Sequence, residues 1–62
     1  SLNRATIEQL ESVPGFNPRI AAEIVAYRRG PPPRAFVTIE ELGKIASIKK
    51  SNLETATPYL KL

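Results

Sequence analysis

An internal repeat limits the folds that this chain can adopt. The sequence aligns with itself when it is shifted by 32 residues. Residues 6–10 (Thr-Ile-Glu-Gln-Leu) align with residues 38–42 (Thr-Ile-Glu-Glu-Leu), and four of the five positions are identical. Apolar residues keep aligning beyond this stretch: Val13 with Ile45, Phe16 with Ile48, Ala21 with Leu53 and Tyr27 with Tyr59. A repeat of about 30 residues cannot bury its apolar face alone. The pattern therefore predicts two copies of one unit that share a core.

Each copy is expected to open with a short helix that starts at a capping box. In this motif the N-cap hydroxyl accepts a hydrogen bond from the N3 amide, and the N3 side chain accepts one from the N-cap amide. The residue before the second box, Val37, is placed to pack on Leu42 as a hydrophobic staple. The predicted boxes are Thr6 with Gln9 and Thr38 with Glu41.

Residues 13–18 (Val-Pro-Gly-Phe-Asn-Pro) carry the signals of a tight hairpin. Gly15 supplies the positive φ that such a turn needs. Asn17 is a favoured N-cap residue and Pro18 is a favoured first residue of a helix. We therefore expect a hairpin here, followed by a helix over residues 18–29 with an apolar stripe at helical spacing.

A stiff, extended link is expected to end the helix and to lead into the second half of the chain. Residues 30–33 (Gly-Pro-Pro-Pro) cannot continue a helix and favour an extended link. The last helix should begin near Ser51, with Ser51 and Glu54 as a further capping box, and its regular part should end at Pro58. The four aromatic side chains are expected in the core, with the two tyrosine hydroxyls at the surface: Phe16, Tyr27, Phe36 and Tyr59.

The residue types that are absent from the sequence restrict the possible functions more than the residue types that are present. The 62 residues include no Cys, His or Asp for nucleophilic, acid–base or metal chemistry, and Glu is the only side-chain carboxylate. We expect a binding module that is not an enzyme and that holds no cofactor or metal. No apolar run approaches the roughly 20 residues of a membrane span, so we expect no membrane contact by these residues. The net charge of +3 permits an acidic partner such as nucleic acid.

Residues 3–10 and 13–21 resemble the tandem helix–hairpin–helix domain of the ComEA-like competence proteins. The resemblance extends over nearly the whole chain and is stronger in the first copy. It implies an all-α, compact tandem helix–hairpin–helix (SAM-like) domain of four to five short helices. Two units related by a pseudo-twofold, residues 1–30 and 37–62, would be joined by a link over residues 30–36, and we expect a monomer.

The resemblance also implies a function: sequence-independent binding of double-stranded DNA during DNA uptake. Backbone amides at such hairpins, helped by the helix dipole, bind phosphate oxygens on the minor-groove side. A ComEA-like domain would lie outside the cytoplasm, tethered to a membrane through sequence upstream of residue 1. The candidate DNA-binding residues are Gly15, Phe16, Asn17 and Arg19 in the first hairpin and Ser47, Lys49 and Lys50 in the second.

Departures from the family pattern leave an alternative open. Asn17 replaces the second glycine of the first hairpin, and residues 47–50 (Ser-Ile-Lys-Lys) replace a Gly-Ile-Gly-Pro turn. Asn17 can be only a helix cap, and the nearby cations can be only solvated surface residues. The alternative function is a protein-interaction or scaffold domain, with another protein subunit as its partner. The minor pseudopilin K of type II secretion systems is of this kind.

Overall fold

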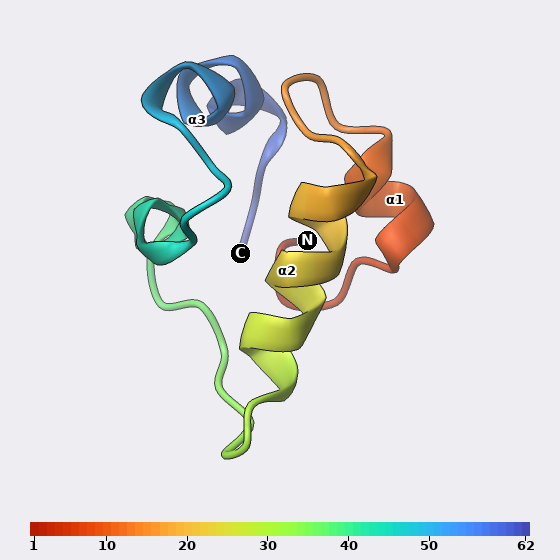
Figure 1. Ribbon diagram of the computed structural model, residues 1–62, viewed down its shortest axis with the longest axis vertical. Helices are drawn as coiled ribbons and strands as arrows, with labels where there is room; N and C mark the ends of the chain where they lie inside the picture. Colours follow the sequence, from red (N-terminus) through yellow and green to blue (C-terminus); the bar gives the residue numbers. More distant parts are fainter.

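The computed structural model describes residues 1–62, and every regular element in it is helical (Figure 1). The expected all-α class is confirmed. Three α-helices and two short 3₁₀ helices follow one another along the chain: α1 (Ile7–Glu11), α2 (Pro18–Arg29), the 3₁₀ helix η1 (Ile39–Lys44), α3 (Lys50–Ala56) and the 3₁₀ helix η2 (Thr57–Tyr59).

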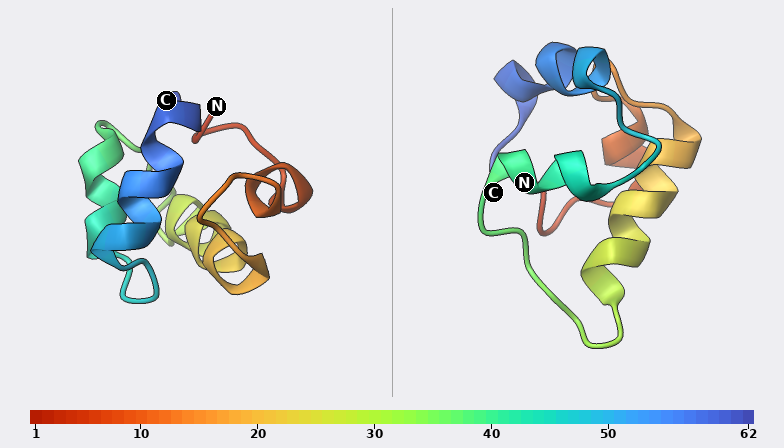
Figure 2. Two further views of the ribbon diagram at one scale, coloured as in Figure 1. Left: turned by 90° about the horizontal axis from the view of Figure 1, so that it is seen from above. Right: turned by 60° about the vertical axis from the view of Figure 1, so that its left-hand side comes forward.

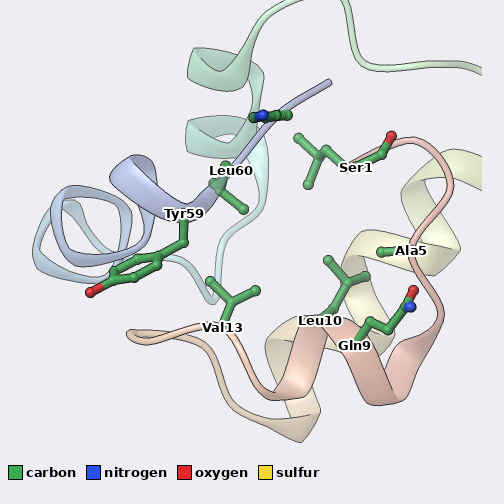
Figure 3. A pocket seen from close by; sticks show the side chains of 9 residues that line it. Ser1, Ala5, Gln9, Leu10, Val13, Tyr59 and Leu60 are labelled. Atoms are coloured by element: carbon green, nitrogen blue, oxygen red, sulfur yellow. The ribbon is translucent and has the colours of Figure 1, made fainter.

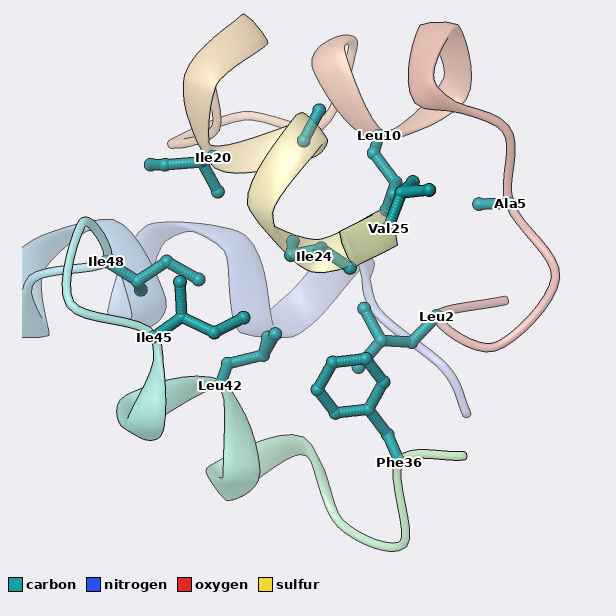
Figure 4. Close-up of a cluster of buried hydrophobic side chains, with 11 residues drawn as sticks. Leu2, Ala5, Leu10, Ile20, Ile24, Val25, Phe36, Leu42, Ile45 and Ile48 are labelled. Atoms are coloured by element: carbon teal, nitrogen blue, oxygen red, sulfur yellow. The ribbon is translucent and has the colours of Figure 1, made fainter. Parts of the chain in front are cut away.

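Helix α2 is the longest element, and the other elements pack around it (Figures 1 and 2). Its apolar stripe, with α1 on one side and the second half of the chain on the other, forms the middle of the core (Figure 4). Both halves of the chain supply side chains to this cluster, as two copies sharing one core require. The eleven members are Leu2, Ala5, Leu10, Ile20, Ala21, Ile24, Val25, Phe36, Leu42, Ile45 and Ile48.

The two hairpins close with equivalent backbone hydrogen bonds. The Phe16 amide donates to the Val13 carbonyl at 3.0 Å, and the Ile48 amide donates to the Ile45 carbonyl at 3.0 Å. These two bonds stand 32 residues apart, which is the period of the sequence repeat. The repeat therefore extends to the backbone at the two hairpin turns, whereas the unit boundaries at residues 30 and 37 stay a prediction.

The first capping box is present as expected. The Thr6 hydroxyl accepts from the Gln9 amide at 3.1 Å, and the Gln9 side chain accepts from the Thr6 amide at 2.9 Å. In the second copy the Glu41 carboxylate accepts from the Thr38 amide at 3.1 Å. The segment that follows is a 3₁₀ helix, so the second copy is wound more tightly than the first.

The predicted staple between Val37 and Leu42 is wrong. Leu42 is fully buried, but the Val37 side chain is 74% exposed. The Val37 amide donates to the Glu41 carboxylate at 2.6 Å, next to the bond from Thr38. Because the carboxylate gathers both amides, the chain enters η1 with Val37 turned to solvent.

Helix α3 begins at Lys50, near Ser51 as expected, but the predicted box of Ser51 and Glu54 is wrong. The N-cap residue is Lys49, whose amide donates to the Asn52 side-chain oxygen at 3.0 Å. The carboxamide of Asn52 thus takes the role that was predicted for Glu54. The α-helix ends at Ala56, and Pro58 lies in η2, as the prediction of a break near that residue requires.

The link after α2 is not extended, which corrects the expectation of a stiff spacer. The Arg34 amide donates to the Arg28 carbonyl at 2.9 Å, so the chain doubles back directly after the helix. Figure 1 shows this tight loop below the end of α2. Arg34 is brought over the ring of Tyr27, with its guanidinium carbon 5.1 Å from the ring centre.

The two tyrosines that match across the repeat differ in burial. Tyr27 stacks on Phe36 with ring centres 4.9 Å apart, and its hydroxyl donates to Glu41 at 3.2 Å. Tyr59 is 65% exposed, so its predicted place in the core is wrong. The cause is local: Tyr27 lies within a regular α-helix, whereas Tyr59 follows Pro58 in a 3₁₀ turn that rotates its side chain outward.

One arginine fastens the beginning of the chain to α2. The Arg28 guanidinium donates to the carbonyl oxygens of Leu2 and Ala5 at 2.9 and 2.8 Å. The Asn3 side chain pairs with both backbone groups of Phe36, which joins the same segment to the second half.

No helix of the structure is long and apolar enough to cross a bilayer.

Candidate nucleic-acid interface

The start of α2 and the second hairpin meet at one shallow cleft of about 320 Å³. Water occupies about 30 Å³ per molecule, so this space admits a phosphate group together with solvent. Four of the seven predicted DNA-binding residues line the cleft: Asn17, Arg19, Ser47 and Lys49. Residues that are far apart in the sequence therefore share one surface, as the predicted interface requires.

Gly15 faces α3 and does not line that cleft. Its φ is +90°, and a Cβ atom at this position would lie 2.8 Å from the Asn52 carbonyl oxygen. Its own carbonyl accepts from the Asn52 side-chain nitrogen at 2.9 Å. Gly15 thus allows the first hairpin to pack closely against Asn52 of α3.

The backbone at the start of α2 offers two amides without a hydrogen-bond partner, those of Asn17 and Arg19. Pro18 has no N–H, the Ile20 amide donates to the Asn17 side chain at 2.8 Å, and the Ala21 amide donates to the Asn17 carbonyl at 2.9 Å. The Arg19 amide is the remaining donor of the first turn, which has no partner within the helix. Asn17 is therefore an N-cap, as predicted, and Arg19 offers both an amide and a guanidinium.

The second hairpin offers cations and a half-buried hydroxyl. Lys49 and Lys50 are both exposed at the start of α3, and Lys49 lines the cleft. Ser47 is half-buried, and its hydroxyl donates to the Glu23 carboxylate at 2.7 Å. Phe16, by contrast, packs against the core and has its amide bonded to Val13, so it offers neither its amide nor an exposed ring.

Sequence reasoning missed Glu23, which lies in the cleft between the predicted residues. One carboxylate oxygen accepts from Ser47, and the other accepts from the Arg19 Nε at 3.2 Å. The hydrogen bond from Ser47, followed by the bond from Arg19, lowers the pKa of Glu23 below its usual value. The only available signal was the spacing of four residues from Arg19, which is typical of an ion pair on one helix face.

Asn52 was missed as well. It caps α3 through its oxygen and reaches Gly15 through its nitrogen, so it holds the two hairpins beside each other. Its place three residues after Lys49 was the available signal, because an amide side chain at N3 can accept from the N-cap amide.

These features define a small all-helical domain in which two hairpins meet beside a cleft lined by Arg19 and Lys49. The chain belongs to the helix–hairpin–helix family, since residues 1–61 match the family described as the helix-hairpin-helix motif. This motif is commonly a nucleic-acid-binding one. No curated protein and no solved structure matches the chain significantly.

Proposed function

We propose that this domain binds double-stranded DNA without sequence preference, through phosphates on the minor-groove side. The observation that carries the proposal is the shared cleft, where Arg19 from α2 lies with Ser47 and Lys49 from the second hairpin. A guanidinium, an ammonium and a free amide are the groups that commonly bind phosphate. The resemblance to ComEA-like domains supports a role in DNA uptake.

The proposed lack of sequence preference is supported by the carboxamide side chains, whose oxygens cap the helices. Asn and Gln read adenine edges when their carboxamides are free. Here the carboxamides of Asn17 and Asn52 are engaged in capping the helices, and that of Gln9 caps α1. The groups left for a ligand are mainly cations, backbone amides and the Ser47 hydroxyl, which suit phosphate contacts. On the minor-groove side the base edges distinguish little more than A·T from G·C, so these groups would read little sequence there.

Titration of a fluorescent duplex tests the proposal. If three to five phosphates are neutralised, log K falls with log salt at a slope of about −3 to −4.5, with Kd about micromolar or weaker at physiological salt. Two duplexes of unrelated sequence should give the same affinity and slope. Absence of binding at about 20–50 mM salt, where such contacts are strongest, would contradict the proposal.

One feature of the structure favours the alternative function of a scaffold domain. A recess of about 210 Å³, lined by six hydrophobic and three polar residues, lies between α1 and residues 59–61 (Figure 3). Tyr59 is exposed at this recess, beside Val13 and Leu60. Such a recess suits an apolar side chain of another subunit, as in a pseudopilin-like assembly. The sequence upstream of residue 1 discriminates: a pilin-like helix supports the scaffold, and a membrane anchor with a linker supports DNA uptake.

The two functions also differ in what Tyr59 does. Under the DNA proposal, Tyr59→Ser leaves the duplex affinity unchanged, because Tyr59 does not line the cleft that holds Arg19. Loss of duplex binding in this variant, with the fold retained by circular dichroism, would contradict the placement of the interface at that cleft.

A further inference from the structure

We propose that Glu23 is a built-in competitor of DNA phosphate, whose carboxylate accepts from the Arg19 Nε–H and the Ser47 hydroxyl and offsets the Arg19 charge that a phosphate would otherwise use. The inference rests on the proposed function and adds a residue that sets its affinity. It follows from three observations: the contacts of Glu23, its charge and its exposure.

The contacts place the carboxylate where a ligand oxygen would bind. Glu23 accepts from Ser47 at 2.7 Å and from the Arg19 Nε at 3.2 Å, and all three residues line the same cleft. A carboxylate and a phosphate are both anionic acceptors of such hydrogen bonds. Because Ser47 has one hydroxyl proton, it cannot donate to Glu23 and to a phosphate at the same time.

The charge of Glu23 opposes a second anion in the cleft. The bonds from Ser47 and Arg19 favour the ionised carboxylate, so Glu23 is charged at neutral pH. An ionised carboxylate beside Arg19 offsets the charge that would otherwise neutralise a phosphate.

The Arg19–Glu23 ion pair is exposed, so a phosphate can replace the Glu23 carboxylate at Arg19. The Arg19 side chain is 81% exposed and that of Glu23 is 37% exposed. Exposed ion pairs of this kind contribute little to stability, so a phosphate can displace the carboxylate from Arg19 without unfolding the site. Glu23 then weakens DNA binding without preventing it.

The contrary role is that Glu23 orients Arg19 toward DNA through its Nε, leaving the outer guanidinium nitrogens free. The two roles predict effects of opposite sign when the charge is removed. A competitor predicts tighter binding and a steeper salt dependence, whereas an orienting residue predicts weaker binding.

Glu23→Gln is the discriminating variant, because glutamine keeps the size of the side chain and an oxygen that accepts from Ser47. Glu40→Gln is the matched control: it makes the same change in net charge at an exposed position on η1, outside the cleft. Duplex titrations over a range of salt give both affinity and slope, and circular dichroism checks that both variants fold.

We expect Glu23→Gln to steepen the salt slope by about 0.9, the increment for one further phosphate contact. That increment corresponds to about eightfold tighter binding at 0.1 M salt, referred to 1 M. We expect Glu40→Gln to keep the slope of the unmodified chain. Adding Arg19→Ala should cancel the gain from Glu23→Gln, because the freed guanidinium produces it.

A measurement on the unmodified chain supplies a second test. The NMR signal of the Arg19 Nε–H reports its bond to Glu23, and it should move when duplex DNA is added. Weaker binding by Glu23→Gln, equal effects of Glu23→Gln and Glu40→Gln, or an unmoved Arg19 signal on a DNA-bound chain would overturn the competitor role and leave the proposed function intact. Failure of the unmodified chain and of Glu23→Gln alike to bind at low salt would overturn the proposed function itself.

Discussion

The side chain of Asn52 donates a 2.9 Å hydrogen bond to the carbonyl oxygen of Gly15, which lies 37 residues away in the sequence, and so joins α3 to the first hairpin. The same carboxamide accepts from the Lys49 amide at 3.0 Å. One residue therefore caps α3 and fixes the first hairpin against it. The cleft that holds Arg19 and Lys49 depends on this contact, because those two residues belong to different hairpins.

Replacing Asn52 tests this contact. Asn52→Ala removes the cap and the bond between the hairpins, and we expect a loss of about 1–3 kcal/mol in the free energy of unfolding. Asn52→Asp is the control, because it keeps an oxygen for Lys49, favoured at the helix N-terminus, and places against the Gly15 carbonyl an oxygen that cannot donate. Urea unfolding should rank Asn52→Asp between Asn52→Ala and the unmodified chain. An unchanged stability in Asn52→Ala would show that the contact is dispensable.

Gly15 and Gly43 provide a matched pair of glycine substitutions. At Gly15, alanine would have to adopt φ +90° with its Cβ 2.8 Å from a backbone oxygen. We expect Gly15→Ala to cost about 2–3 kcal/mol, which lowers Tm by about 10–20 °C in a domain of this size.

At Gly43 a Cβ would meet nothing within 4 Å, so Gly43→Ala should be neutral or stabilising by up to about 1 kcal/mol. Thermal melts of the two variants give the comparison. Equal effects at the two positions would contradict the assigned geometry of the first hairpin.

Arg28 and its neighbour Arg29 test the attachment of the N-terminal segment. Arg28→Ala loses two charge-assisted bonds to the carbonyls of Leu2 and Ala5, and we expect a loss of about 1.5–3 kcal/mol. Arg29→Ala removes an exposed cation and should change stability by less than about 0.5 kcal/mol. Urea denaturation distinguishes the two, and a larger effect at Arg29 would be incompatible with the observed contacts.

Much of the fold could be predicted from the sequence, because the strongest signals were local. The turn at Gly15, the cap at Asn17 and the helix from Pro18 depend on backbone preferences of single residues. The 32-residue repeat placed the second hairpin correctly because its apolar positions fill the same core. These features follow from rules that act within a few residues.

The errors came where a tertiary contact overrode a local rule. Ser51 fits a capping box, but the carboxamide of Asn52 caps the helix and also reaches Gly15. Val37 fits a staple, but the Glu41 carboxylate holds its amide and turns the side chain outward. In the candidate site the residue types could be predicted, but the bond from Ser47 to Glu23 joins the second hairpin to α2 and leaves no sequence pattern.

Acid should destabilise the domain in a way that depends on Glu41. Hydrogen bonds from the Val37 and Thr38 amides, in that order, lower the pKa of Glu41 in the folded chain. As pH falls below the unfolded value of about 4.3, the unfolded state takes up its proton first. This contribution is therefore present above pH about 4.3 and is lost as pH falls through the folded pKa.

Urea midpoints measured between about pH 7 and pH 3 check this dependence. Glu41→Gln should show a smaller decline in stability than the unmodified chain over this range. The exposed Glu40→Gln serves as the control and should keep the full decline. Identical declines in Glu41→Gln and the unmodified chain would contradict the role given to this carboxylate.

The central claim, that the cleft between the hairpins binds phosphate, is tested most directly by reversing its two cations. Arg19→Glu with Lys49→Glu should weaken duplex binding by at least about 60-fold at 0.1 M salt, the effect of two lost phosphate contacts. The thermal melt should stay nearly unchanged, because both side chains are exposed. Arg29→Glu with Lys61→Glu makes the same change in net charge outside the cleft and should retain most of the binding. Equal losses in the two double variants would contradict the account, since binding would then depend on net charge alone.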